Sequence, residues 1–123
     1  MDNRYQRGIE IVTKLAGEQG KGALEELGVF SPDFASKIIE FGFGEIYSRP
    51  VLDLKQRELL TLASLITQGA ESQLQFHFRS SLHIGLTKEE IMEVILHCAL
   101  YAGFPRALSA LQVFQGIIAV EGR

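Results

Sequence analysis

Apolar residues recur along this 123-residue chain at helical spacing, whereas the alternation typical of strands is scarce. A stripe that includes Ile9 and Val12 predicts a first helix over about residues 3–20. Glycines then follow at short intervals, from Gly17 to Gly28, and predict an inter-helix loop with one short turn. The pattern beyond this loop is again helical. The chain is therefore expected to be an all-α, single-domain bundle of six or seven helices.

Start signals mark the later helices. Thr87 and Glu90 form a capping box, in which each side chain bonds to a free backbone N–H at the helix start. Pro32 opens another helix, because proline at the first helical position loses no needed donor. These signals and the apolar spacing predict later helices over residues 31–47, 54–68, 70–84, 87–103 and 105–120.

Composition narrows the classes of partner. The net charge is −3 and the 12 Lys and Arg residues are scattered, so no nucleic-acid surface is expected. No segment reaches the ~20 apolar residues of a membrane span, and the charged N-terminus does not resemble a secretory signal. Cys98 is the only cysteine, which excludes a disulfide within the chain. We therefore expect no membrane partner and a reducing, cytoplasmic location.

Metal and nucleotide sites are not predicted. His77, His83 and His97 do not have the i, i+4 spacing of the zinc-protease helix. A nucleotide-binding loop would have to follow a strand, and the sequence predicts no strand for it to follow.

A longer pattern lies between Arg57 and Pro105. It consists of an apolar helix, a turn, a helix with one histidine, and then the motifs Gly-x-Thr-x-x-Glu-Ile and Tyr-x-Gly-x-Pro, as RELLTLASLITQGAESQLQFHFRSSLHIGLTKEEIMEVILHCALYAGFP. With the upstream segment GEIYSRPVL, it resembles the carboxymuconolactone decarboxylase family over about residues 42–111. The resemblance implies one domain over residues 1–123 with an alkylhydroperoxidase D-like fold.

The family's peroxidase branch depends on a Cys-x-x-Cys motif between a glutamate and a histidine. In register, Glu58 and His77 fall on the glutamate and the histidine, but Ala70 and Gln73 occupy the two cysteine positions. A dithiol cycle needs one thiolate to attack and a second thiol to resolve the intermediate. Cys98 lies on another helix and is expected to be a buried structural thiol. The antioxidant alternative is therefore disfavoured.

The resemblance also implies a catalytic group. His77 coincides with the family's histidine, and imidazole exchanges protons near neutral pH. Glu71 and Glu58 are the two carboxylates that could act with it. From the residues alone, a helix histidine at the edge of the core is the favoured interpretation of His77, whereas stabilisation of a helix N-terminus and a role in the site are equally favoured for Glu71. Either glutamate remains possible as the partner of His77.

Substrate-binding residues are expected around the same region. Arg49, in the Arg-Pro step that resembles the decarboxylases, and Arg57 are the candidates for holding a substrate carboxylate. Tyr101 belongs to the Tyr-x-Gly-x-Pro turn and is a further candidate.

The function implied by the resemblance is decarboxylation of a carboxylated unsaturated lactone, similar to 4-carboxymuconolactone, in the degradation of aromatic compounds. Such a lactone is its own electron sink, so no metal or cofactor is expected. The family also implies a homo-oligomer, a hexamer built as a trimer of dimers. Besides the peroxidase, the remaining alternative is a non-catalytic member of the family.

Overall fold

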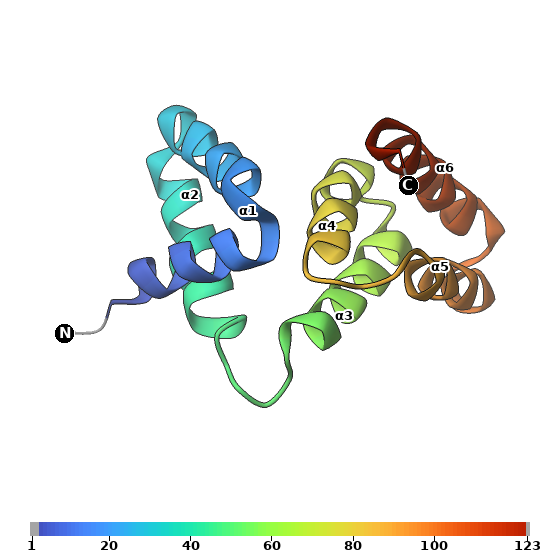
Figure 1. The fold of residues 1–123 in the computed structure, drawn as a ribbon, viewed down its shortest axis with the longest axis horizontal. Coiled ribbons are helices and arrows are strands. Elements are labelled where there is room, and N and C mark those ends of the chain that lie inside the picture. The colour runs from blue at the N-terminus through green and yellow to red at the C-terminus, as the bar shows by residue number, and fades with distance from the viewer. Residues whose placement is uncertain (1–2, 123) are drawn as a thin grey trace. The chain divides into compact units, whose positions relative to one another are not determined.

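The computed structural model describes residues 3–122, and these residues form six α-helices and one π-helix (Figure 1). No strand occurs among the described residues. The expected all-α fold is confirmed. The chain divides into two compact units, Met1–Leu54 and Lys55–Arg123.

The N-terminal unit consists of α1 (Arg4–Phe30), α2 (Pro32–Lys37) and the π-helix η1 (Ile38–Ile46). The Asn3 side chain caps α1 by accepting a hydrogen bond from the Gln6 N–H at 3.1 Å. Ser31 caps α2 in the same way, with the Phe34 N–H at 3.3 Å, and Pro32 opens that helix as predicted.

The predicted break at Gly17 is confirmed, but the loop predicted from there to Gly28 is wrong, because residues 18–30 are helical. Gly17 alone leaves the helical region, with φ 68° and ψ −170°, a conformation that is essentially restricted to glycine, and the helix bends there. The other glycines stay helical although each costs about 1 kcal/mol relative to alanine. Packing offsets this cost, since Leu24 is buried and a Cβ on Gly28 would lie 3.4 Å from the Ala35 Cβ of α2.

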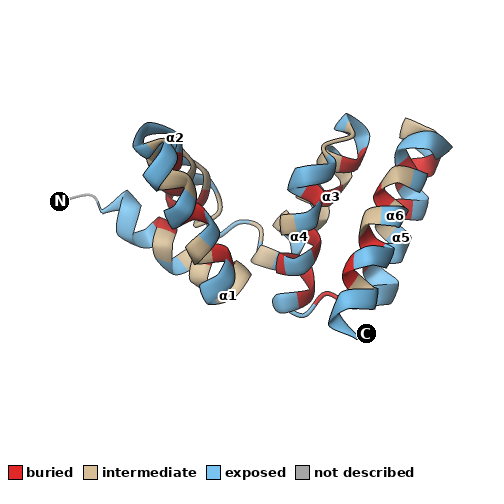
Figure 2. Cartoon of the chain, turned by 90° about the horizontal axis from the view of Figure 1, so that it is seen from above, coloured by how far each residue is buried: buried red, intermediate tan, exposed pale blue. Residues whose placement is uncertain are grey.

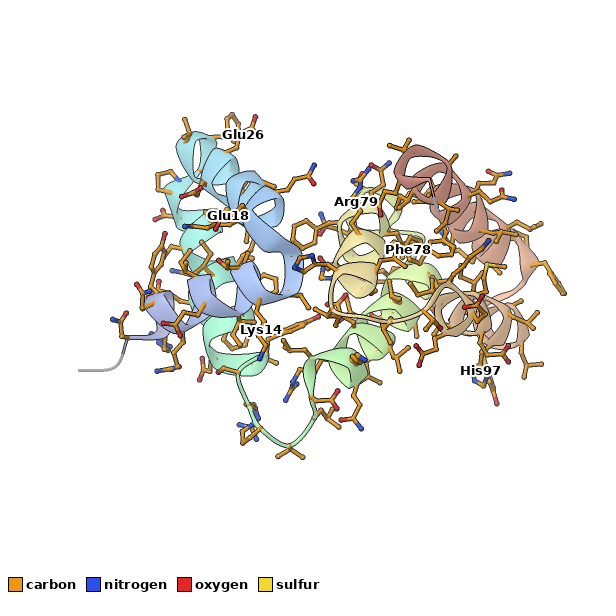
Figure 3. All side chains as sticks on the ribbon, viewed as in Figure 1. Lys14, Glu18, Glu26, Phe78, Arg79 and His97 are labelled. Atoms are coloured by element: carbon orange, nitrogen blue, oxygen red, sulfur yellow. The ribbon has the colours of Figure 1, made fainter. Side chains whose placement is uncertain are left out.

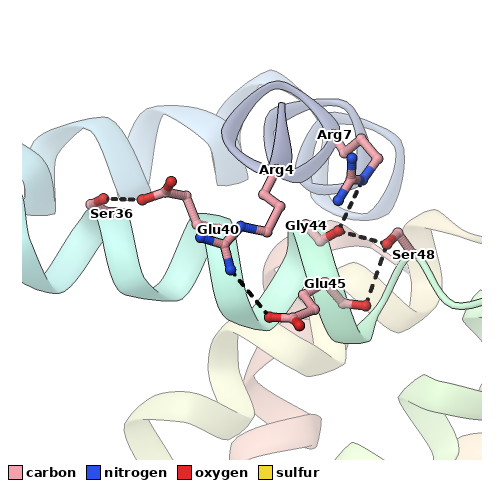
Figure 4. Close-up of polar contacts among 7 residues, drawn as sticks. All are labelled: Arg4, Arg7, Ser36, Glu40, Gly44, Glu45 and Ser48. Carbon is pink, nitrogen blue, oxygen red and sulfur yellow. Dashed lines mark hydrogen bonds and ion pairs between the residues drawn. The ribbon is translucent and has the colours of Figure 1, made fainter. Parts of the chain in front are cut away.

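The single helix predicted over residues 31–47 is also wrong in part, because it changes to π geometry after Lys37. The Tyr47 N–H bonds to the Gly42 carbonyl, five residues earlier, at 2.9 Å. Figure 4 shows that the Gly44 carbonyl accepts hydrogen bonds from Arg7 Nε–H at 3.2 Å and from Ser48 Oγ–H at 2.6 Å. The Arg7 bond ties η1 to α1.

Two glycines allow the backbones of α1 and η1 to touch. A Cβ on Gly8 would lie 2.1 Å from the carbonyl oxygen of Ile39, and one on Gly44 would lie 2.1 Å from that of Arg4. An exposed ion pair between Arg4 and Glu45, at 3.5 Å, closes the same crossing (Figure 4).

The C-terminal unit consists of α3 (Leu54–Gln68), apart from its first residue, α4 (Glu71–His83), α5 (Lys88–Ala102) and α6 (Phe104–Glu121). These bounds lie within one or two residues of the predicted ones. The capping box of α5 is confirmed, with Thr87 Oγ accepting from the Glu90 N–H at 3.0 Å and Glu90 Oε1 from the Thr87 N–H at 2.8 Å. The bond from the Thr87 N–H is the main reason why the pKa of Glu90 is lowered.

The core of the C-terminal unit is continuous across its four helices, and the buried positions form inward-facing stripes (Figure 2). The Phe78 ring of α4 lies 5.0 Å from the Phe114 ring of α6. Phe78, which is labelled in Figure 3, is fully buried in this core. Leu62 and Ile66 bring α3 into the same core. Among residues 3–122, no helix combines the length and hydropathy needed to cross a bilayer.

Candidate active site

Glu58 of α3 and His77 of α4 meet inside the C-terminal unit. His77 Nδ1 lies 3.1 Å from Glu58 Oε1 and 3.0 Å from Oε2, so the ring nitrogen faces both carboxylate oxygens. The Glu58 side chain is fully buried, whereas 12% of the His77 side chain is exposed. The arrangement therefore consists of a buried carboxyl group and a histidine with one accessible edge.

The helical repeat explains why Glu58 is buried. It lies four and eight residues before Leu62 and Ile66, on the face of α3 that enters the core. A carboxylate in such a place is destabilising unless hydrogen-bond donors satisfy it. The contact with His77 supplies such a donor, so this polar pair belongs to the interior of the fold.

The contact with Glu58 occupies Nδ1 of His77 and leaves Nε2 available for proton exchange. When Glu58 is a carboxylate, it accepts a hydrogen bond from Nδ1–H of His77 and fixes the orientation of the ring. Nε2 is then the nitrogen that can exchange a proton with a bound molecule. The ring also makes an edge contact with Phe76, with 5.1 Å between the centroids.

Ser81 is a polar neighbour that the sequence interpretation missed. Its Oγ lies 3.2 Å from Glu58 Oε2 and 2.7 Å from the backbone carbonyl oxygen of His77. The available signal was its position four residues after His77, since residues at that spacing share a helix face.

The other predicted carboxylate lies elsewhere. Glu71 is exposed in the first turn of α4, where a negative charge stabilises the helix N-terminus. Within the described part of the chain, the carboxylate in contact with His77 is that of Glu58.

The remaining candidates are spread over three places. Arg57 is half-buried on α3, next to Glu58 in the sequence, and Arg49 is exposed in the N-terminal unit after η1. Tyr101 is 79% exposed on α5, and its ring lies 5.5 Å from that of His97.

A cavity of about 410 Å³ lies between α3 and α5 and is mostly apolar. Its lining residues are Leu59, Leu60, Ala63, Glu90, Glu93, Val94, His97 and Cys98. His97 projects from the outer side of α5 (Figure 3). His77 is not part of this lining, so the cavity and the Glu58–His77 pair are separate features.

Cys98 is buried as predicted, with 5% of the residue exposed. Its Sγ lies 4.0 Å from the Ala63 carbonyl oxygen, and burial raises the pKa of the thiol. A raised pKa lowers the fraction of reactive thiolate at neutral pH. Over residues 3–122, no group of three His, Cys, Asp or Glu side chains is arranged to hold a metal ion.

Comparison with known proteins identifies the family that these motifs predicted. The model of the carboxymuconolactone decarboxylase family matches residues 32–116. The chain is 39% identical to 4-carboxymuconolactone decarboxylase of Acinetobacter baylyi, and the match covers 94% of this chain and 87% of the relative. It is 36% identical to nitrosuccinic acid decarboxylase of Metarhizium robertsii, with 93% of this chain and 80% of the relative covered. It is 37% identical to an uncharacterized 15.0 kDa protein of Paracoccus denitrificans, with 73% of this chain and 69% of the relative covered. The chain thus belongs to the carboxymuconolactone decarboxylase family.

Proposed function

We propose that this protein is a carboxy-lyase whose proton donor is His77, positioned by Glu58. The observation that carries the proposal is the 3.0 Å contact between His77 Nδ1 and a fully buried carboxylate. The two relatives with a named activity support it, because both are decarboxylases. The substrate class that we propose is a carboxylated unsaturated lactone such as 4-carboxymuconolactone, formed in the degradation of aromatic compounds.

The chemistry requires little of the protein. When the C–C bond to the carboxylate breaks, carbon dioxide leaves and the electron pair stays on the ring carbon. It delocalises through the double bond into the lactone carbonyl. His77 in its imidazolium form then donates the Nε2 proton to carbon, which leaves the neutral ring with its proton on Nδ1, and solvent returns a proton to Nε2. Proton transfer by a placed side chain contributes on the order of 100- to 10,000-fold in rate. Because the lactone accommodates the electrons, the proposed reaction needs no cofactor.

Charge complementarity supports roles for the arginines. Arg49 and Arg57 are the candidates for orienting the substrate carboxylates, since guanidinium groups bind carboxylates through paired hydrogen bonds. Tyr101 is a further candidate for contact with substrate. Each of these three assignments is a hypothesis that substitution can test separately from that of His77.

The peroxidase alternative has no support from the thiol chemistry. Ala70 and Gln73 stand at the cysteine positions of that branch, and the single thiol, Cys98, is buried with a raised pKa. A single unpaired thiol fits the reducing, cytoplasmic location that we propose.

We also propose that the protein assembles as a homohexamer. Leu60 of α3 lines the 410 Å³ cavity and is 60% exposed, and Leu96 and Leu100 of α5 are 62% and 74% exposed. We call these three leucines the α3–α5 apolar surface. Large apolar side chains that are exposed together mark contact surfaces. A second copy of the chain is the occupant that we propose for this surface.

A direct assay tests the proposed activity. Purified protein is incubated with 4-carboxymuconolactone, and carbon dioxide release and loss of the substrate carboxylate are followed. We expect turnover by the native chain and a loss of at least 100-fold in His77→Gln, with a melting temperature within a few degrees of the native value. Glu58→Gln should show a similar loss, whereas Glu71→Gln, at an exposed carboxylate on the same helix as His77, should retain most of the activity.

Two results would count against the proposal. Full activity in His77→Gln would remove the proton donor, and equal losses in Glu58→Gln and Glu71→Gln would remove the distinction between the carboxylates. If the native chain releases no carbon dioxide from this lactone or from other carboxylated lactones, the non-catalytic alternative is favoured.

A further inference from the structure

Two adjacent serines on α4 are buried although both are polar. Ser80 is 1% exposed and Ser81 is 0% exposed. Each hydroxyl lies near the carbonyl oxygen four residues earlier, that of Phe76 at 3.0 Å for Ser80 and that of His77 at 2.7 Å for Ser81. Only Ser81 also reaches a carboxylate, with its Oγ 3.2 Å from Glu58 Oε2.

The hydroxyl of Ser81 has a single proton and two acceptors. It can donate to Glu58 Oε2 or to the His77 carbonyl, but not fully to both. A charged carboxylate is the stronger acceptor, since hydrogen bonds to ionised groups are about twice as strong as neutral ones. When Glu58 is neutral, the Ser81 hydroxyl can donate to the His77 carbonyl, and its oxygen can accept a hydrogen bond from the carboxyl O–H of Glu58. Ser81 can therefore satisfy Glu58 in either protonation state.

We propose that Ser81 is a positioning residue for the Glu58–His77 pair, acting through Glu58 and not through the substrate. Its contact with Oε2 holds the carboxyl group in the plane in which both oxygens face His77 Nδ1, at 3.0 and 3.1 Å. Without that contact Oε2 loses one of the groups that hold it, so the carboxyl group can turn away from the ring more easily and Nε2 is held less firmly toward a bound molecule. The catalytic part of this inference rests on the proposed function.

The adjacent serine provides the control. Ser80→Ala removes a buried hydroxyl from the same helix and the same type of bond to a carbonyl, but leaves the surroundings of Glu58 intact. We expect Ser81→Ala to lower kcat for decarboxylation of 4-carboxymuconolactone by about tenfold, with KM within twofold of the native value. A slightly misplaced His77 ring would slow the proton transfer more than it would weaken substrate binding. Ser80→Ala should change both constants by less than twofold. Equal effects of the two substitutions would overturn the proposal.

A second variant separates the hydroxyl from its volume. Ser81→Cys keeps a γ atom in the same place but replaces the hydroxyl with a weak donor. We expect its kcat to resemble that of Ser81→Ala. If it resembles the native enzyme instead, the side chain only fills space and has no positioning role.

Nitrogen NMR of the histidine rings tests the positioning without any substrate. With 15N-labelled histidine at a pH where the rings are neutral, and with His77→Gln used to assign the signals, the native His77 ring should carry its proton on Nδ1. Ser81→Ala should change the His77 ring shifts toward a mixture of tautomers, whereas Ser80→Ala should leave them unchanged. Unchanged shifts in Ser81→Ala would contradict the inference.

This readout separates the two proposals. If the ring shifts respond to Ser81→Ala but the native protein decarboxylates no lactone, the positioning holds and the proposed function fails. If decarboxylation is observed but Ser81→Ala changes neither the ring shifts nor kcat, the proposed function holds and the positioning role fails.

Discussion

At the scale of single residues, the burial of Glu58 and the orientation of His77 depend on each other. A fully buried carboxylate is stable only with donors around it, and a histidine acts as a directed proton donor only when one ring nitrogen is held. The same 3.0 Å contact meets both requirements. A role in stability and a role in proton transfer are therefore compatible for these residues, and only substitutions that keep the fold can distinguish them.

Cys98 gives a prediction at this scale. Because burial raises the pKa of its thiol, little thiolate exists at neutral pH, and alkylation by iodoacetamide should be slow at pH 7 and accelerate as the pH rises above the range of an ordinary thiol. Cys98→Ser should keep at least half of the native decarboxylation rate. A large loss of activity in a folded Cys98→Ser protein would show that the thiol takes part in the reaction.

At the scale of elements, the close crossing of α1 and η1 should depend on Gly44, one of the two glycines at which these backbones touch. A Cβ on Gly44 would lie 2.1 Å from a backbone oxygen, which cannot move away easily, whereas a Cβ on Gly42 would meet nothing within 4 Å. Gly44→Ala should therefore lower the free energy of unfolding by about 1–3 kcal/mol. Gly42→Ala should leave it unchanged or raise it by about 0.5–1 kcal/mol.

Urea unfolding at one fixed protein concentration measures both variants, because assembly would otherwise alter the apparent stability. Equal urea midpoints for Gly44→Ala and Gly42→Ala would mean that the backbones of α1 and η1 do not approach each other as closely at Gly44 as the structure indicates.

The helices of the C-terminal unit could be predicted because their signals are local. A capping box at Thr87 and an apolar stripe each lie within a few residues, and the structure retains them. The errors in the N-terminal unit arise where packing overrides propensity. The glycines after Gly17 remain helical against neighbouring helices, and η1 depends on how Gly44 meets α1, which no local pattern encodes.

The same distinction applies to the candidate site. Motif register pointed to Glu58 and His77, but their contact joins residues 19 apart in the sequence, on two helices. The residues alone therefore could not choose between Glu58 and Glu71. Ser81 was missed because a serine in a helix has no chemical signature until the carboxylate beside it is known.

At the scale of the whole molecule, the α3–α5 apolar surface leads to a prediction about mass. We expect light scattering at micromolar concentration to give a mass several times the 13.7 kDa of one chain, with six copies as the expected number. Leu100→Glu places a charge on this surface and should reduce the mass, since an unpaired charge is costly to bury in a contact. Gln112→Glu, at an exposed polar position of α6, is the matched charge control.

A monomer mass for the native chain would contradict the proposed assembly. An unchanged mass in Leu100→Glu would show instead that copies meet through another surface.

The buried carboxylate of Glu58 also bears on how this protein can be engineered. Replacing buried ionic groups by well-packed apolar ones often leaves stability unchanged or raises it, and stabilising changes can lower activity where a site is intrinsically unfavourable to the fold. A library of variants selected only for survival after heating would thus accumulate apolar residues at positions 58 and 77 together, because replacing one partner alone leaves the other buried and unsatisfied. The proposed proton donor would then be lost, so selection for heat resistance has to be coupled to turnover, or both positions have to be held constant.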